Sequence, residues 1–374
     1  MARHITSLNI NGYRGLCDFF ADDIADINIL LGNNNSGKTS VLEVLDTFSA
    51  ITSPSKWLNN SVYRNSLMSG LNPCIDLHNL FNINYTDMPI DVEYTDTLGK
   101  KNNLILRQKT EDVRLDLKSI KDIDRIGYRR ITQNIEKYSM KDITEHNMEN
   151  VVVECKHSTM TFDFNNEKTV STDFFEFSNI IRSKSDIKCL FKTQYEYPYK
   201  YITQQFNLSD IIENQEMYEE LISVLKVFDE DITQVFADNE NNSVVYKIAS
   251  KKNEKALPIS VFGDGLKLAL SIFAALPKAR DGIMLIDEFN SSLHTSQISK
   301  VLQVIITICK RFNIQLFMTT HSLEAVDKVI ECCDDFLDDL RIIRINKKTK
   351  QTYAKVINGN NAKQLRQNNE AELR

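Results

Sequence analysis

The 374-residue sequence lacks several features that would each assign it to a class of protein. Its apolar runs, such as 283–286 and 301–309, fall far short of the roughly 20 residues that a membrane-spanning helix needs. The seven cysteines include no Cys-x-x-Cys pair, and Cys332 and Cys333 are adjacent, so neither a zinc site nor a disulfide framework is expected. Sustained heptads, internal repeats and low-complexity tracts are also missing, which excludes a long coiled coil and a repeat protein.

The composition is that of an ordinary globular protein. Hydrophobic residues make up 42% and charged residues 26%, and the length allows two domains with a sizeable core. The 45 basic and 51 acidic residues give a net charge of −6, which argues against a globally basic nucleic-acid binder but allows a local basic patch. Because no signal peptide, membrane segment or disulfide pattern is recognised, we expect a cytoplasmic protein.

The two ends of the chain alternate between strand and helix patterns. Near the N-terminus, an apolar run at 27–31 predicts a strand and the apolar spacing of 40–50 predicts a helix. From residue 256 onward we expect strands at 282–286, 314–318 and 340–345, and helices at 266–276, 295–311 and 322–332. Such alternation predicts a mainly parallel, layered α/β sheet built from 1–50 and 256–374.

Residues 51–255 interrupt this alternation. Their patterns predict strands near 90–94, 104–107 and 151–155, and one amphipathic helix at about 209–228. We therefore expect a mixed α/β insertion domain that forms a lid or arm.

A phosphate-binding loop follows the first apolar strand. The sequence fits Gly-x-x-x-x-Gly-Lys-Ser/Thr between a predicted strand and a predicted helix, which is the context the motif requires. The glycines let backbone N–H groups point at phosphates, while Lys38 would bridge the β- and γ-phosphates and the Thr39 hydroxyl would bind Mg²⁺. We expect ATP and Mg²⁺ as ligands, held by Gly32, Asn33, Asn34, Asn35, Ser36, Gly37, Lys38, Thr39 and Ser40.

Two further strands end in side chains suited to nucleotide chemistry. The run at 283–286 leads into Asp287, which would hold the hydrated Mg²⁺, and Glu288, which would polarise the attacking water. The strand at 314–318 leads to His321, which can contact the γ-phosphate and position the water. A second interpretation makes His321 a residue at a helix start next to a Ser322 cap, and both can hold together.

The segment before the helix at 266–276 forms a second candidate anion-binding loop. Ser260, Gly263 and Gly265 precede that helix, and a second such loop indicates a nucleotide held between two protomers. An ordinary loop-to-helix turn explains the bare pattern equally well.

The four motifs in this order resemble an ABC-type ATPase of the SMC/RecF/OLD branch. The opening segment 10–16 is similar to that branch's first strand with its Phe-Arg-Gly, and 32–39 matches the usual sequence of its phosphate loop. Leu285 to Glu288, followed by Leu293, His294 and Gln297, resembles its Asp-Glu…Leu-His-Pro…Gln stretch, which carries the D-loop. The resemblance covers about 170 residues at the two ends and implies an α/β P-loop NTPase fold, with an ABC-type ATPase head at 1–50 and 256–374.

The resemblance also implies roles for these residues. Catalysis would fall to Lys38, Glu288 and His321, with Thr39 and Asp287 at the metal. Ser260, Gly263 and Gly265 would act in trans on the partner's γ-phosphate, and 291–294 would line the dimer seam.

The chain departs from the family at two positions. Leu268 replaces an arginine and Thr295 a proline, positions that bear on the hydrolysis rate rather than on nucleotide binding. The family's glutamine loop is not placed, and Gln108 and Gln194 are weak candidates for it.

The resemblance finally bears on partners. Only 53 residues follow His321, too few for the Toprim nuclease of many OLD proteins, and we interpret the acidic run at 334–339 as a solvated helix end. The chain is therefore similar to stand-alone antiphage-defence ATPases that work with a separately encoded nuclease or toxin. We expect a homodimer, or a higher homo-oligomer built of dimers, that switches on ATP hydrolysis, and the alternative is an ATP-bound scaffold that barely hydrolyses.

Nucleic acid is a further candidate partner. Residues 100–130 hold ten basic and five acidic side chains, and so could follow a phosphate backbone, although a solvated charged face explains them slightly better.

Overall fold

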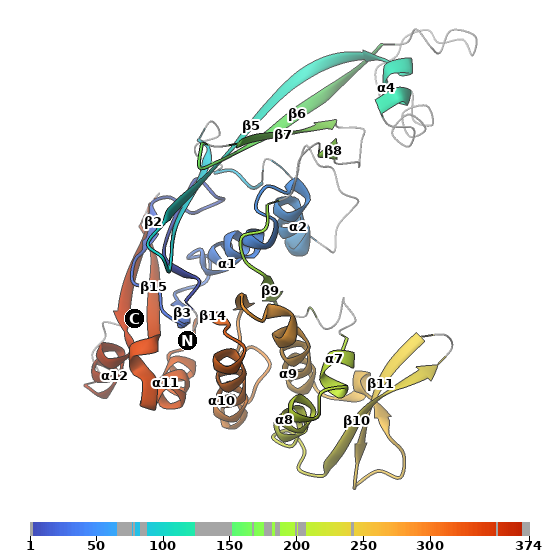
Figure 1. Ribbon diagram of the computed structural model, residues 1–374, viewed down its shortest axis with the longest axis vertical. Coiled ribbons are helices and arrows are strands. Elements are labelled where there is room, and N and C mark those ends of the chain that lie inside the picture. The colour runs from blue at the N-terminus through green and yellow to red at the C-terminus, as the bar shows by residue number, and fades with distance from the viewer. Residues whose placement is uncertain are drawn as a thin grey trace.

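The structure is a computed structural model that describes residues 3–65, 77, 79–82, 88–123, 152–166, 168–175, 182–183, 188–198, 200, 207–240, 243–348 and 351–368. Two large sheets and a small one organise these residues (Figure 1). One large sheet is mainly parallel and the other is antiparallel.

The mainly parallel sheet has six strands in the order β16-β15-β3-β14-β13-β9. Five strands run parallel and β16 pairs antiparallel with β15 at one edge. The strands are β3 (Ile27–Leu31), β9 (Thr193–Glu196), β13 (Ile283–Ile286), β14 (Gln315–Thr320), β15 (Leu340–Lys348) and β16 (Gln351–Asn358). Every residue of β3, β13 and β14 is buried, as expected for parallel strands covered on both faces.

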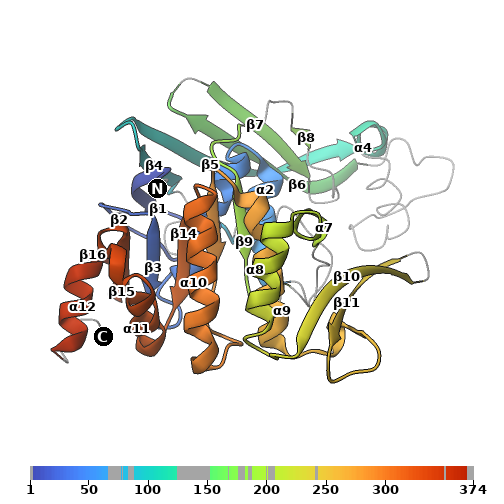
Figure 2. The ribbon, with the colours of Figure 1, turned by 60° about the horizontal axis from the view of Figure 1, so that its bottom comes forward.

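Helices cover one face of this sheet (Figure 2). Ile29, Met284 and Leu316 point from the strands into a core shared with these helices. The helices are α8 (Gln215–Leu225), α9 (Asp264–Ala275) with η5 (Leu276–Ala279), α10 (Thr295–Arg311), α11 (Leu323–Cys332) with η6 (Asp334–Asp339), and α12 (Gly359–Gln367).

The opposite face carries α1 (Lys38–Asp46), which continues into η1 (Thr47–Ala50). Leu30, Leu285 and Phe317 belong to a second core shared with α1 and with the antiparallel sheet. All residues of α1 except Thr39 are buried, since sheets lie on both sides of it. This helix therefore sits rigidly behind the loop that precedes it.

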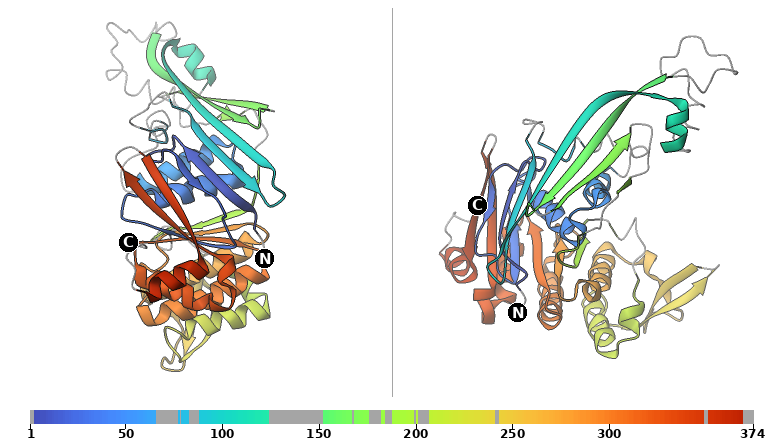
Figure 3. Two further views of the ribbon diagram at one scale, coloured as in Figure 1. Left: turned by 90° about the vertical axis from the view of Figure 1, so that its left-hand side faces the viewer. Right: turned by 45° about the horizontal axis from the view of Figure 1, so that its top comes forward.

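The antiparallel sheet has seven strands in the order β2-β1-β4-β5-β6-β7-β8. β5 and β6 are its longest strands, and with α4 they extend away from the body as an arm (Figure 3). Near α4 a small separate core forms around Leu117, Ile120, Val153 and Cys155. The elements are β1 (Ile5–Asn11), β2 (Phe19–Ala21), α2 (Pro54–Asn65), β4 (Ile90–Asp96), β5 (Lys101–Asp116), α4 (Leu117–Ile123), β6 (Val152–Phe164), β7 (Lys168–Phe175) and β8 (Arg182–Ser183).

A three-stranded sheet lies beside α8 and α9. It contains β10 (Ile232–Glu240), β11 (Ser243–Ser250) and β12 (Leu257–Pro258), preceded by α7 (Ser209–Ile212) and followed by η4 (Ile259–Val261). The single helix predicted at 209–228 is wrong, because it is divided into α7 and α8. Asn214 has extended backbone angles and its side chain accepts a hydrogen bond from the N–H of Met217, so it caps a new helix there.

The segment 51–255 is divided among these parts. Its described strands join β1 in the antiparallel sheet, join β13 through β9, and form the three-stranded sheet. They do not build one sheet of their own, because β4 and β9 complete sheets begun by the two ends of the chain. The domain boundaries at 50/51 and 255/256 stay a prediction.

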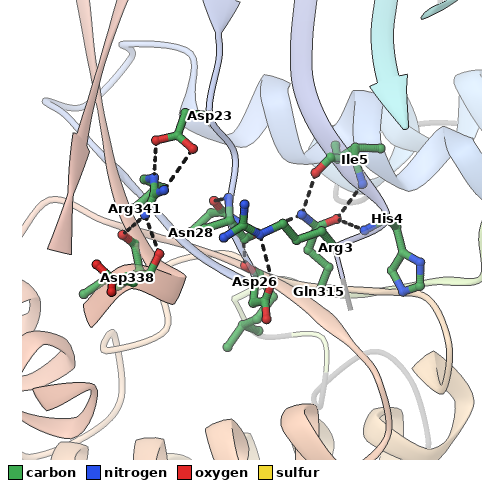
Figure 4. A network of polar contacts seen from close by, with 12 residues as sticks. Arg3, His4, Ile5, Asp23, Asp26, Asn28, Gln315, Asp338 and Arg341 are labelled. Carbon is green, nitrogen blue, oxygen red and sulfur yellow. Dashed lines mark hydrogen bonds and ion pairs between the residues drawn. The ribbon is translucent and has the colours of Figure 1, made fainter. Parts of the chain in front are cut away.

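A polar network closes the amino ends of the parallel strands, the edge away from the phosphate loop (Figure 4). Gln315, wholly buried, bonds to the backbone of Ile5 in both directions and so joins β14 to β1. The Arg341 guanidinium meets both carboxylate oxygens of Asp23 at 2.8 and 2.9 Å. These contacts fix the antiparallel sheet against the parallel one.

Among the described residues, no helix is long and apolar enough to cross a membrane. The acidic run at 334–339 is the short helix η6, and Asp334, Asp335 and Asp338 in it are exposed.

Candidate nucleotide-binding site

The motif 32–39 comprises the loop after β3 and the first two residues of α1, at the carboxyl edge of the parallel sheet. Gly37 has φ of +107°, and a Cβ built there would lie 2.5 Å from a methyl carbon of Leu16. A Cβ on Gly32 would lie 2.6 Å from the carbonyl oxygen of Ile345. Both glycines are thus required by close packing, and Asn33, Asn34 and Asn35 form the exposed tip.

The side chain of Lys38 lies within this loop. Its Nζ donates to the carbonyl oxygens of Gly32 at 2.8 Å and Asn33 at 3.0 Å. Burial lowers the pKa of Lys38, and the carboxylates of Glu288 and Asp287 oppose that shift. The Lys38 ammonium is therefore held by the backbone carbonyls of Gly32 and Asn33.

Thr39 and Asp287 meet although they are 248 positions apart in the sequence. The Thr39 hydroxyl donates to Oδ2 of Asp287 at 2.9 Å, and the Tyr195 hydroxyl approaches the same oxygen at 3.4 Å. Oδ1 of Asp287 accepts from the Thr319 hydroxyl at 2.5 Å. Neighbouring strands β9, β13 and β14 thus place a carboxylate beside the phosphate loop.

Glu288, which follows β13, and His321, which follows β14, contact each other. His321 Nδ1 lies 2.9 Å from Oε2 of Glu288. Glu288 has φ of +50°, and its N–H donates to the Thr319 hydroxyl at 2.8 Å, which fixes this turn. Ser322 caps α11 by accepting from the N–H of Ala325, so the helix-start interpretation describes Ser322 while His321 faces Glu288.

The residues present fit a magnesium nucleotide. The Thr39 hydroxyl and the Asp287 carboxylate are hard oxygen donors, and Mg²⁺ in nucleotide sites takes one or two protein ligands together with phosphates and water. Ser36 Oγ is buried and, in the part of the chain that the structure describes, has no hydrogen-bond partner. An unpartnered hydroxyl inside the loop is suited to a phosphate oxygen. Ser40 lies buried in the first turn of α1.

The second candidate loop lies at the start of α9. Ser260 is in η4 and Gly263 caps α9, and both are exposed. A Cβ on Gly265 would lie 2.6 Å from the carbonyl oxygen of Ser292, so this residue packs against the segment that follows Glu288. No hydrogen bond between described residues joins 260–265 to 32–40. The structure brings 32–40, Asp287, Glu288 and His321 together. Ser260, Gly263 and Gly265 share no hydrogen bond with that group among the described residues.

Several residues of the site escaped the sequence analysis. Thr319 and Thr320 precede His321, and the Thr320 hydroxyl donates to Asn290 at 2.9 Å. The paired threonines were a visible signal, whereas Tyr195 comes from a strand with no recognisable motif. His294 and Gln297 belong to the stretch that resembles the family's D-loop segment, and they form a capping box at the start of α10.

The remaining sequence candidates are scattered. Gln194 lies in β9, paired with Met284, while Gln108 lies on the arm and bonds to Thr110. In the basic segment, Arg114 pairs with Glu154 and Lys109 with Glu111, and the part of this segment beyond residue 123 falls outside the described residues.

A phosphate loop with a buried lysine, a metal-suited threonine–aspartate pair and a glutamate at the end of the adjacent strand define a P-loop ATPase. Residues 4–326 match the family model described as an AAA ATPase domain, and the chain belongs to this family. The α/β P-loop ATPase fold that the sequence predicted is thereby confirmed.

Two curated relatives match parts of the chain. A Helicobacter pylori protein named "ATP/GTP phosphatase" is 38% identical over 129 residues, 33% of this chain and 34% of that protein. The chain thus matches about a third of that relative's length. "Uncharacterized protein MJECL11" of Methanocaldococcus jannaschii is 28% identical over 112 residues, 30% of this chain and 98% of that protein.

Solved SMC head domains are also similar. A head with an extended coiled coil, bound to the C-terminal domain of ScpA from Pyrococcus furiosus, aligns with TM-score 0.49 and 8% identity, covering 98% of this chain and 99% of that one. The SMC head of Thermotoga maritima aligns with TM-score 0.41 and 10% identity, covering 95% and 99%.

Proposed function

We propose that the chain hydrolyses Mg²⁺-bound ATP at the loop 32–40, and that ATP-dependent pairing of two copies makes it a switch for a partner. The observation that carries the proposal is the 2.9 Å contact between Thr39 and Asp287, with Glu288 and His321 beside it. Such a set unites phosphate binding, metal binding and water activation at one sheet edge.

The chemistry follows from these side chains. Lys38 would leave the loop carbonyls for the β- and γ-phosphates, and Thr39 and Asp287 would hold Mg²⁺, which neutralises charge on the phosphates when bound. Glu288 would orient the attacking water and take its proton, with His321 holding the carboxylate in place. Positioning and electrostatics supply most of the rate enhancement in such reactions.

Pairing of two copies is supported by the position of the second loop. Ser260 and Gly263 are exposed, and a Cβ built on Gly263 would meet no atom within 4 Å. An open glycine loop at the start of a twelve-residue helix is suited to a phosphate brought by another molecule. Each protomer would supply this loop to the nucleotide of its partner.

The partner belongs to the proposal as well. The resemblance to antiphage-defence ATPases favours a separately encoded nuclease or toxin, or a nucleic acid, held or released as the two copies close. The name of the Helicobacter relative supports nucleotide phosphatase chemistry for the third of the chain that it matches.

The test is the variant Glu288→Gln in a steady-state ATPase assay. We expect kcat to fall by about 100-fold or more while ATP binding stays unchanged, because the amide cannot accept the proton of the water. Glu324→Gln is the matched control, since Glu324 is an exposed carboxylate at the start of α11. Wild-type turnover in Glu288→Gln would refute the assignment.

Turnover measured across a range of protein concentrations tests the pairing of two copies and the ATP-bound scaffold alternative. A turnover per protomer that rises with concentration indicates composite sites made by pairing. If wild type binds ATP and shows no turnover, the ATP-bound scaffold replaces the hydrolysing switch.

A further inference from the structure

A buried carboxylate at the end of β9 has no part in the chemistry described above. The side chain of Glu196 is 4% exposed. One of its oxygens accepts from the Ser271 hydroxyl at 2.5 Å and the other from Lys200 Nζ at 2.6 Å. Burial raises the pKa of Glu196, and Lys200 and Ser271 act against that rise.

Stability alone does not account for this group. Removing two charges from water is costly, and replacing a buried ion pair by apolar side chains of similar volume is often neutral or stabilising. Ser271, which binds the carboxylate, is itself buried in α9, and its sequence neighbours Leu270 and Ile272 both belong to the core. The groups that Glu196 connects indicate a role other than stability.

On one side Glu196 connects to the metal position. Its carbonyl oxygen accepts from the N–H of Asp287 at 2.8 Å, and β9 and β13 pair so that Glu196 stands opposite Ile286. The preceding residue, Tyr195, brings its hydroxyl to 3.4 Å from Oδ2 of Asp287. A movement of Asp287 on binding a metal would pull directly on the end of β9.

On the other side Glu196 connects to the helix that carries the second loop. Ser271 lies in α9, about two turns after Gly263 caps it. Because α9 is a continuous helix, a shift at Ser271 moves its first turn as well. The loop 260–265 packs against Ser292 through Gly265, and among the described residues it shares no hydrogen bond with the nucleotide site. Glu196 adds a hydrogen-bonded route from Asp287 to Ser271 of α9.

We infer that Glu196 is a positioning residue that couples the occupancy of the nucleotide site to the orientation of α9 and the loop 260–265. The inference rests on the proposed function and deepens it, since it assigns the link between the two halves of the composite site. It predicts an effect within a single protomer, before any pairing.

Hydrogen exchange measures this coupling directly. At a concentration where the wild type is monomeric, Mg²⁺ with a non-hydrolysable ATP analogue should change amide exchange in 259–267 by about tenfold. Ser271→Ala and Glu196→Gln should bind the analogue like wild type and lose that change. The serine variant deletes a single hydroxyl, so the test stands if the glutamate variant fails to fold.

The matched control is Thr193→Val. Thr193 is also buried in β9, and its hydroxyl bonds to Asp46, the last residue of α1, rather than to α9. This variant loses a buried hydrogen bond and should keep the response of 259–267. In kinetics, Ser271→Ala and Glu196→Gln should each lower kcat about tenfold with KM within about twofold, and the double variant should lose no more than either single one.

The results that overturn the inference are distinct from those that overturn the proposed function. A wild type without any response in 259–267, or variants that keep the response, would refute the coupling even if ATP is hydrolysed. Additive kinetic losses with weaker analogue binding would assign Glu196 to structure alone. The response is measured without turnover or pairing, so failure of Glu288→Gln to lose activity leaves it unaffected.

Discussion

The Thr319 hydroxyl donates to Oδ1 of Asp287 at 2.5 Å and, as an acceptor, receives the N–H of Glu288 at 2.8 Å. One buried hydroxyl therefore orients both the candidate metal ligand and the candidate base. Thr319→Val keeps the shape of the side chain and removes the hydroxyl. We expect kcat to fall about 10- to 100-fold with nearly unchanged ATP affinity, because a supporting contact is lost while the phosphate loop is intact. Steady-state kinetics and analogue titration measure the two quantities.

Thr172→Val is the control for that substitution. Thr172 is also fully buried, on β7, and its hydroxyl has no hydrogen-bond partner among the described residues. Valine at this position should leave turnover unchanged and leave stability equal or slightly higher, because an unsatisfied polar atom is removed. Equal kcat in both valine variants would contradict a special role for Thr319.

Gly37→Ala should weaken ATP binding strongly. Alanine at φ of +107° is strained, and its Cβ would lie 2.5 Å from a methyl carbon of Leu16, whose side chain is fully buried. We expect the Kd for ATP to rise about 100-fold or more. Gly99→Ala tests strain without the clash, since Gly99 has φ of +78° with no atom within 4 Å. It should cost roughly 1 kcal/mol of stability and leave the Kd for ATP unchanged.

Asp287→Asn should act through the metal. The amide keeps the geometry and loses the charge, so the Mg²⁺ concentration for half-maximal turnover should rise about tenfold or more, while binding of ATP in excess chelator stays the same. Asp281→Asn is the control, because Asp281 is exposed before the other end of β13 and its φ of +55° suits asparagine equally. The same Mg²⁺ dependence in both variants would exclude Asp287 as a ligand.

Local patterns predicted much of the fold and the position of the phosphate-loop motif in the candidate site. The strand at 27–31 and the helix at 295–311 have the predicted bounds, because a continuous apolar run and a 3.6-residue period each describe burial directly. The motif 32–39 occurs between a strand and a helix as expected, since backbone geometry at Gly32 and Gly37 restricts the residue type.

What could not be predicted depends on contacts between distant segments. β9 has only four residues and enters the parallel sheet through pairing with β13, so nothing in its own sequence distinguishes it from a loop. For the same reason Tyr195 and Glu196 were missed. The predicted helix at 209–228 has a continuous apolar face, and only the capping side chain of Asn214 divides it.

Asp26 gives a prediction of stability against pH. It lies in the network at the amino ends of the strands, where Oδ1 accepts from Arg3 and Oδ2 is buried without a hydrogen-bond partner among the described residues (Figure 4). Burial raises the pKa of Asp26, and the neighbouring Asp339 adds to the rise. A raised pKa in the folded state means that the folded protein binds the proton more tightly than the unfolded chain does. The contribution of Asp26 is therefore fully present below its unfolded pKa of about 3.9 and is lost as pH rises through the folded value.

Asp26→Asn removes that loss, because the amide carries no charge at any pH. We expect the variant to be more stable than wild type at pH 7 by about 1 kcal/mol, and the difference to vanish near pH 3.5, measured by urea unfolding across the range. Loss of the half-exposed Arg3 contact subtracts little. Asp23→Asn should give the opposite sign, since Arg341 lowers the pKa of Asp23 and that contribution is present at neutral pH and lost on acidification. Destabilisation by both variants at pH 7 would show that Arg3 outweighs the burial of the Asp26 charge.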